Sequence, residues 1–161
     1  GHGVRGGMGK LYFFTHDGDL DALRDTCVSW TEVDEALRKC RARQVVVFLD
    51  CCHAGAFGDR HASADQLMEG LVTKAGVMVF ASSRGNEQSL ENPEWGHGAF
   101  TKAVLDGLRG EADVFKRGVV TVSGLMTYVT DRVVQLTGGR QNPWVPRIEQ
   151  FDPQLQLAKV R

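Results

Sequence analysis

The stretch that decides the fold of this chain is Val45-Val46-Val47-Phe48-Leu49-Asp50-Cys51-Cys52-His53-Ala54-Gly55. Its first half is a run of β-branched and apolar residues without polar alternation, which is typical of a strand buried on both faces of a parallel sheet. An acid, two thiols and an imidazole follow this strand directly. Because ligands bind at the carboxyl ends of strands in open α/β sheets, we expect chemistry at this point.

Outward from this stretch, strands and helices alternate. Further strands are predicted at Leu11–Phe14 and Val77–Ala81, with a late one around residues 155–157. Helical periodicity covers residues 99–108 and 123–136, and a short helix is predicted around residues 67–71. This order predicts an α/β fold with a mostly parallel sheet.

A further helix is predicted over residues 31–43. Thr31 is expected to cap it, with acidic residues in the first turn near the positive end of the helix dipole. Val33, Leu37 and Cys40 fall on one helical face, so we expect Cys40 to be a small buried side chain.

Length and composition favour one soluble domain. The chain has 161 residues, of which 42% are hydrophobic and 24% charged. The net charge of −1 argues against a strongly basic nucleic-acid binder, and no apolar run is long enough for a membrane span. Two of the four cysteines are adjacent, which does not fit a disulfide framework, so a reducing, cytoplasmic location is expected.

A cysteine nucleophile needs a base or cation nearby, because the free thiol has a pKa of about 8.5. Histidines at positions 2, 16, 53, 61 and 97 compete for this role. His53 adjoins Cys52, but sequence neighbours usually point apart. His2 and His97 each lie in a Gly-His-Gly triplet, where the glycines let the backbone approach a ligand closely.

Four segments carry a resemblance to a known family. Residues 50–55 (DCCHAG) resemble the nucleophile motif of metacaspases and related bacterial caspase-like peptidases, and residues 1–3 (GHG) resemble their histidine motif. Cys52 follows His2 by 50 residues, and caspases have about 50. Residues 81–87 (ASSRGNE) are similar to paracaspases, and residues 97–101 (HGAFT) resemble a helix start frequent in bacterial members.

The resemblance implies the fold and the catalytic roles. It implies a caspase-like three-layer sandwich, with residues 1–161 as a single catalytic domain that lacks its N-terminal strands. Cys52 would be the nucleophile and His2 its partner, and the backbone N–H groups of Gly3 and Cys52 would form the oxyanion hole. His97 would belong to the helix start rather than to the dyad.

The resemblance also implies the specificity. Metacaspases and paracaspases cleave after Arg or Lys, and Asp50 and Glu87 match the acids of their substrate pocket. Two carboxylates at the bottom of a slot suit a guanidinium or ammonium group. Glu91 is a weaker candidate for this role. The sequence therefore predicts a cysteine endopeptidase that cleaves after a basic residue through a thioester.

Other functions stay open. One alternative is a catalytically silent or partner-activated caspase-like interaction module; another is a different Cys-His amide hydrolase or a transpeptidase. A missing N-terminal segment or a second chain is expected to complete the sheet.

The chemistry requires no cofactor. Consecutive ligands at residues 51–53 cannot surround one zinc ion. The acidic turn of Asp17, Asp19 and Asp21 does not have EF-hand spacing. The resemblance leaves activation by Ca²⁺ open, because many metacaspases need it.

Overall fold

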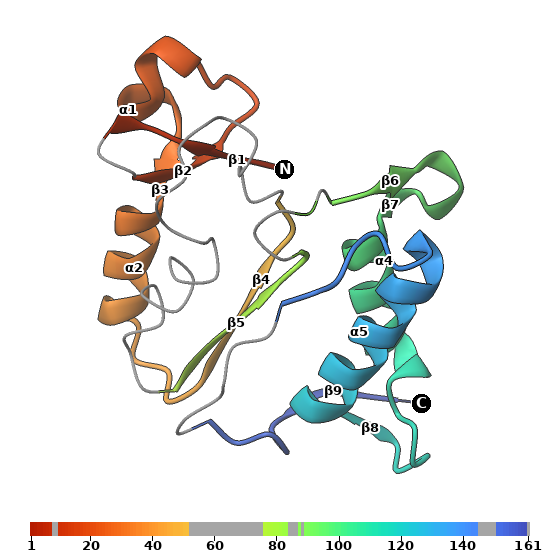
Figure 1. Cartoon of the computed structure of the whole chain (residues 1–161). Helices are drawn as coiled ribbons and strands as arrows, with labels where there is room; N and C mark the ends of the chain where they lie inside the picture. The colour runs from red at the N-terminus through yellow and green to blue at the C-terminus, as the bar shows by residue number, and fades with distance from the viewer. Residues whose placement is uncertain (8–9, 52–75, 84–86, 88, 145–150, 161) are drawn as a thin grey trace.

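The computed structural model describes residues 1–7, 10–51, 76–83, 87, 89–144 and 151–160 (Figure 1). It begins with a small antiparallel sheet of three strands in the order β1-β2-β3, which are β1 (His2–Arg5), β2 (Leu11–Phe14) and β3 (Val28–Ser29). His2 lies opposite Phe14 in this sheet. The short helices η2 (Leu20–Ala22) and α1 (Leu23–Thr26) connect β2 with β3. The predicted strand at Leu11–Phe14 is confirmed.

Helix α2 (Trp30–Lys39) begins one residue earlier and ends four residues earlier than the sequence predicted. The prediction that Thr31 caps it is wrong. Ser29 is the cap, since its hydroxyl accepts a hydrogen bond from the backbone N–H of Glu32, while the Glu32 carboxylate accepts from the backbone N–H of Ser29. This reciprocal pair is a capping box.

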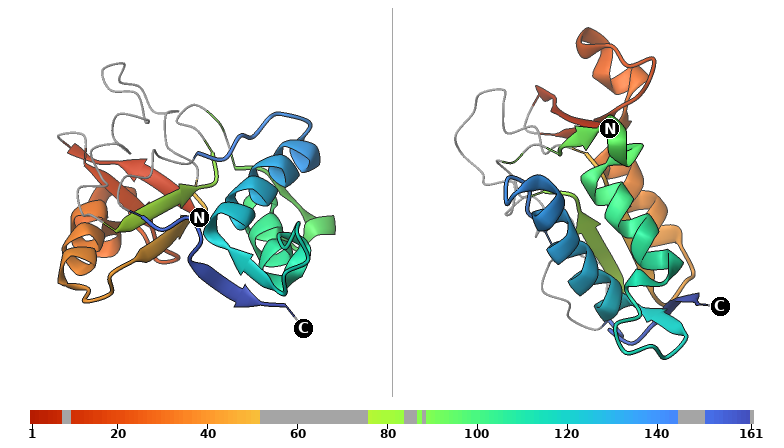
Figure 2. Two further views of the ribbon diagram at one scale, coloured as in Figure 1. Left: turned by 90° about the horizontal axis from the view of Figure 1, so that it is seen from below. Right: turned by 90° about the vertical axis from the view of Figure 1, so that its right-hand side faces the viewer.

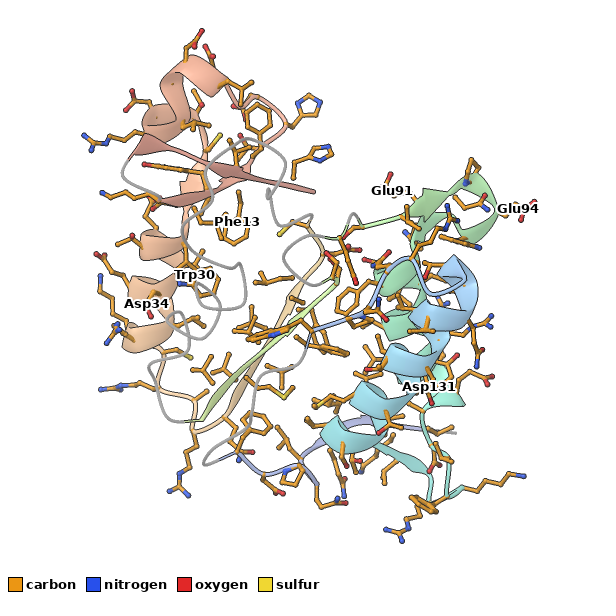
Figure 3. The ribbon with its side chains drawn as sticks, viewed as in Figure 1. Phe13, Trp30, Asp34, Glu91, Glu94 and Asp131 are labelled. Atoms are coloured by element: carbon orange, nitrogen blue, oxygen red, sulfur yellow. The ribbon has the colours of Figure 1, made fainter. Side chains whose placement is uncertain are left out.

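The prediction that Cys40 is buried is also wrong. Cys40 follows the last helical residue in an extended conformation and is exposed. The buried face of α2 is formed instead by Trp30, with Val33 and Leu37 packed beside it. The Trp30 ring meets Phe13 of β2 edge to face, with centroids 5.9 Å apart (Figure 3). Trp30 therefore connects α2 to the N-terminal sheet.

The centre of the fold is a parallel pair of strands, β4 (Val45–Leu49) and β5 (Val77–Ala81). All five residues of β5 are buried, as predicted for a strand covered on both faces. One face of β5 packs against α2, while Phe80 on the other face contacts Phe100 of α4 (Ala99–Asp106) edge to face. Figure 2 shows these helices on opposite sides of the pair.

Further hydrogen bonds extend this pair. Ser82 N–H donates to the carbonyl of Leu49 at 2.8 Å, so the ladder continues past β5. On its other edge β5 is bridged by Trp144, which exchanges two backbone hydrogen bonds with Ala81. Among the described residues, β4 has β5 as its one strand partner.

The second half of the chain packs two helices against β5. These elements are β6 (Glu91–Asn92), η3 (Pro93–Trp95), β7 (His97–Gly98), α4, the π-helical turn η4 (Gly107–Glu111), β8 (Val119–Thr121), α5 (Val122–Thr137) and β9 (Gln156–Lys159). The helices predicted over residues 99–108 and 123–136 and the late strand are thus found, with small shifts of their ends. A Cβ atom on Gly107 would lie 2.5 Å from Leu125, so this glycine allows α4 and α5 to approach closely.

The expected sheet is found only in part. Of the described strand pairs, β4–β5 is parallel, while the β1–β2–β3, β6–β7 and β8–β9 pairs are antiparallel. The helix predicted around residues 67–71 lies outside the described residues. No helix within the described part of the chain is long and apolar enough to cross a membrane.

Candidate active site

The predicted site lies at the carboxyl end of the β4–β5 pair. Asp50 follows β4 directly, and Cys51 after it is buried. Cys52 and His53 lie outside the described residues. The catalytic roles predicted for Cys52 and His2 therefore stay predictions.

His2 is the first residue of β1 and its side chain is exposed. The nitrogen of Gly1 donates a hydrogen bond of 2.9 Å to the backbone carbonyl of Asp50. This contact joins the start of β1 to the end of β4. It brings the residue before His2 against the residue two positions before Cys52. The predicted oxyanion residue Gly3 is buried one position further along β1.

Asp50 lies at the N-terminus of α4. Its Oδ2 accepts a hydrogen bond from the hydroxyl of Thr101, and a Cβ atom on Gly98 would lie 3.2 Å from the same oxygen. A carboxylate is favoured at this end of a helix by the helix dipole. Gly98 leaves room for the carboxylate and Thr101 donates to it, so the HGAFT segment contributes directly to the site. The sequence pattern of this segment indicates only a helix start.

A pocket of about 540 Å³ opens beside Asp50. The hairpin β6–β7 and the first turn of α4 form its wall, and Glu91, His97 and Thr101 are among the residues that line it. Two carboxylates, Asp50 and Glu91, thus border one cavity. The pocket lies next to the start of β1, because Gly1 also lines it.

Glu87 lies elsewhere in the site region. One carboxylate oxygen accepts the backbone N–H of Asn142 at 2.6 Å, and the other accepts the side-chain amide of Asn142 at 2.8 Å. The side chain is half-buried and does not line the pocket beside Asp50. Asp50 and Glu91 are among the described residues that line that pocket, and Glu87 is not. A substrate-binding role for Glu87 stays a prediction.

A buried polar network supports the segment after β5. Gln141 is fully buried; its side-chain amide donates to the carbonyl of Ser82 at 2.8 Å and its side-chain oxygen accepts from the N–H of Leu90 at 2.7 Å. The hydroxyl of Ser82, also buried, donates to the carbonyl of Cys51 at 3.2 Å. The network connects the residue before Cys52 to the loop that leads into β6. No local sequence signal identified it.

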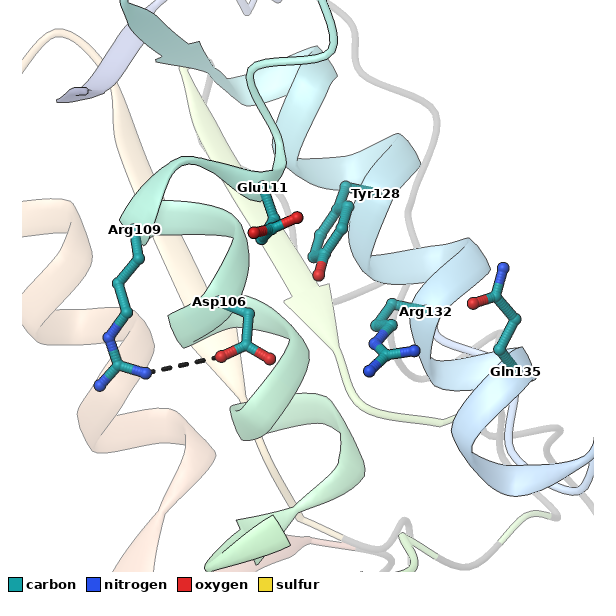
Figure 4. A pocket seen from close by; sticks show the side chains of 6 residues that line it. All are labelled: Asp106, Arg109, Glu111, Tyr128, Arg132 and Gln135. Carbon is teal, nitrogen blue, oxygen red and sulfur yellow. Dashed lines mark hydrogen bonds and ion pairs between the residues drawn. The ribbon is translucent and has the colours of Figure 1, made fainter. Parts of the chain in front are cut away.

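A second pocket, of about 590 Å³, lies between α4 and α5 and contains none of the predicted site residues (Figure 4). Asp106 forms ion pairs there with Lys102 at 2.5 Å and with Arg109 at 3.5 Å. Burial, with smaller contributions from nearby acids, raises the pKa of Tyr128 above 10.0, and Arg132 opposes this shift. The pocket mixes charges of both signs and gives no clear preference for a ligand.

Among the described residues, no three His, Cys, Asp or Glu side chains are grouped as a metal site requires. The expectations about cofactors and calcium therefore stay predictions.

Comparison with known proteins identifies the family. No protein of curated function matches the chain significantly. The family model described as the caspase domain of peptidase family C14 matches residues 1–152, which is most of the chain. The matched residues include β1, the parallel pair β4–β5, the residues that line the pocket beside Asp50, and the helices α2 and α4 on the two sides of the pair. The chain therefore belongs to the caspase domain family of cysteine peptidases.

Proposed function

We propose that the protein is a caspase-like cysteine endopeptidase of the metacaspase and paracaspase kind, which cleaves after Arg or Lys with Cys52 as nucleophile and His2 as its partner. The observation that carries this proposal is the hydrogen bond between Gly1 and the carbonyl of Asp50. It joins the residue before His2 to the residue two positions before Cys52, at the sheet edge where α/β folds bind ligands.

The reaction follows from these two groups. The Cys52 thiolate attacks the peptide carbonyl carbon, and the C–N bond breaks as His2 transfers a proton to the leaving amine. The product acyl group remains as a thioester on Cys52. His2 then takes a proton from water, which attacks the thioester and releases the acid and the thiolate. The N–H groups of Gly3 and Cys52 would stabilise the oxyanion at both stages.

The substrate preference rests on charge. Asp50 borders the pocket and is held in place by Thr101, so a positively charged side chain placed there gains an ion pair. An aspartate side chain, which true caspases select, would be repelled by the acids of this pocket.

The test uses two matched electrophilic peptide probes on the full-length protein, one ending in Arg and one in Asp. Mass spectrometry locates the adduct. We expect an Arg-probe adduct on Cys52 that is lost in His2→Ala and kept in the control His16→Ala, because His16 is exposed and does not line the pocket. An Asp-probe adduct would retain the nucleophile and refute the acidic pocket. An adduct on Cys51 would refute the assignment of Cys52, and no adduct would favour the interaction module.

We further propose that another strand pairs with the outer edge of β4. Within the described residues this edge has no strand partner, and Phe48 on β4 is 37% exposed. An unpaired strand edge with apolar residues beside it promotes association. A segment or partner chain that supplies this strand should protect the β4 amides from hydrogen exchange when it binds, and unchanged exchange would contradict the proposal.

A Ca²⁺ requirement can be examined in the same probe assay. Addition of a chelator should abolish labelling of Cys52 if calcium activates the enzyme, and excess Ca²⁺ should restore it.

A further inference from the structure

We propose that Glu91, at the start of β6, is the second carboxylate that selects the basic residue of the substrate. This inference rests on the proposed function, and it assigns to Glu91 the role that the family resemblance suggested for Glu87. It follows from how the chain distributes three acids, Asp50, Glu87 and Glu91, around the end of the parallel pair.

Glu87 is already engaged inside the protein. Both of its carboxylate oxygens accept hydrogen bonds from Asn142, at 2.6 Å and 2.8 Å, and its backbone carbonyl accepts from the hydroxyl of Ser83 at 3.2 Å. Asn142 occupies one acceptor site on each oxygen and fixes the orientation of the Glu87 carboxylate, which leaves fewer acceptor sites for a guanidinium group. The geometry therefore assigns Glu87 to the attachment of the loop after β5.

Glu91 lies across the pocket wall from Asp50. In the β6–β7 hairpin, Glu91 is directly opposite Gly98, and opposite residues in an antiparallel pair have Cα atoms about 4.5–5.5 Å apart. Gly98 in turn lies against the carboxylate of Asp50, since a Cβ on it would be 3.2 Å from Oδ2. One glycine thus separates the two acids, and both line the same cavity.

The hairpin that carries Glu91 is firmly attached. Ala99 N–H, at the start of α4, donates to the carbonyl of Leu90 at 2.9 Å, and the N–H of Leu90 is held by Gln141. Glu91 itself is exposed, so its carboxylate stays accessible to a ligand. Two carboxylates on one cavity repel each other, and a guanidinium or ammonium group removes that repulsion. The chemical class that fits is a basic side chain.

The experiment measures how strongly the full-length enzyme prefers charge. Two peptides are compared that differ only at the residue before the cut, one with Arg and one with citrulline, which has the same shape without the charge. Glu91→Gln is compared with Glu87→Gln and with the control Glu94→Gln. Glu94 lies on the same hairpin (Figure 3) and is exposed. It is not among the residues that line the pocket.

We expect Glu91→Gln to lower the Arg-to-citrulline ratio of kcat/KM by roughly tenfold, as the loss of one charge-assisted pair predicts. Glu94→Gln should keep the ratio within about twofold, because exposed charges outside the pocket contribute little. Glu91→Asp keeps the charge and should retain most of the preference, which guards against a folding defect in the glutamine variant. An unchanged ratio in Glu91→Gln, or a loss in Glu87→Gln instead, would overturn the inference.

A binding measurement separates this inference from the proposed enzyme activity. Calorimetry with the same two peptides on Cys52→Ala reports the pocket without chemistry. Binding of the Arg peptide that weakens in Cys52→Ala/Glu91→Gln supports the pocket even if the wild type cleaves nothing. Equal binding of the Arg and citrulline peptides would contradict the role of Glu91 even if Cys52 cleaves both peptides.

Discussion

Replacing Gln141 with methionine tests whether the buried network holds the segment after β5. The two side chains have similar volumes, but methionine forms neither of the two hydrogen bonds that Gln141 makes with Ser82 and Leu90. The carbonyl of Ser82, a fully buried residue, would lose its donor, and the N–H of half-buried Leu90 would lose its acceptor.

The expected cost follows from these two groups. An unsatisfied buried polar group costs about 1–3 kcal/mol. Leu90 is only half-buried, so water can form a hydrogen bond with its N–H and reduce the cost at that group. We therefore expect Gln141→Met to lower the free energy of unfolding by about 2–4 kcal/mol.

Urea unfolding of the full-length protein, analysed by linear extrapolation, measures this difference. Gln135→Met is the matched control, because Gln135 is exposed on α5, and a surface substitution of this kind changes stability by about 0.5 kcal/mol or less. A loss below about 1 kcal/mol for Gln141→Met, or a loss equal to that of the control, would refute the reasoning.

Three further predictions concern single groups. Thr101→Val should destabilise the protein by about 1.5–3 kcal/mol, because it removes the hydroxyl that donates to the Asp50 carboxylate, whereas Thr101→Ser should retain most of the stability in the same urea assay. Hydrogen bonds from the side chain and backbone of Ser29 lower the pKa of Glu32 below 4.5. The stability that this pair contributes should therefore be present above pH 4.5 and be lost as pH falls through the lowered pKa. Thermal melts of wild type and Glu32→Gln at a series of pH values measure this difference in stability. A difference that is already lost above pH 4.5 would contradict the prediction. Burial raises the pKa of Tyr128 above 10.0, so its stabilising contribution should be lost only as pH rises through that raised pKa. A pH titration of the phenolate absorbance of wild type, from which that of Tyr128→Phe is subtracted, reports Tyr128 alone. This absorbance should appear above pH 10.0, and its appearance at lower pH would be inconsistent with the described burial.

The central strands and helices were predictable because their signals are local. A β-branched run without polar residues marks β4 and β5, and the spacing of apolar residues marks α5. The start of α2 was missed although Ser29 and Glu32 have capping-box spacing, because Thr31 is followed by an acid at the same interval. Cys40 was misplaced because periodicity does not show where a helix ends.

The site was predictable only as a set of segments. Motifs identified Asp50, and the start of β1 does lie beside it. The partner of each acid depends on contacts between distant residues. Glu87 meets Asn142 and Asp50 meets Thr101 across more than 50 positions of sequence. Such pairings have no local signal, so the division of roles between Glu87 and Glu91 could be inferred only from the structure.

The bridge between β5 and Trp144 has a kinetic consequence. Helices α4 and α5 are near neighbours along the chain, whereas β5 needs partners from β4 and from the segment at Trp144. Contacts between distant parts of a chain close more slowly, because loop closure costs entropy that grows with loop length. We expect the helical pair to form first and the sheet edge around Asp50 to close last. A chain that folds in this order completes the region around Asp50 only in the last step of folding.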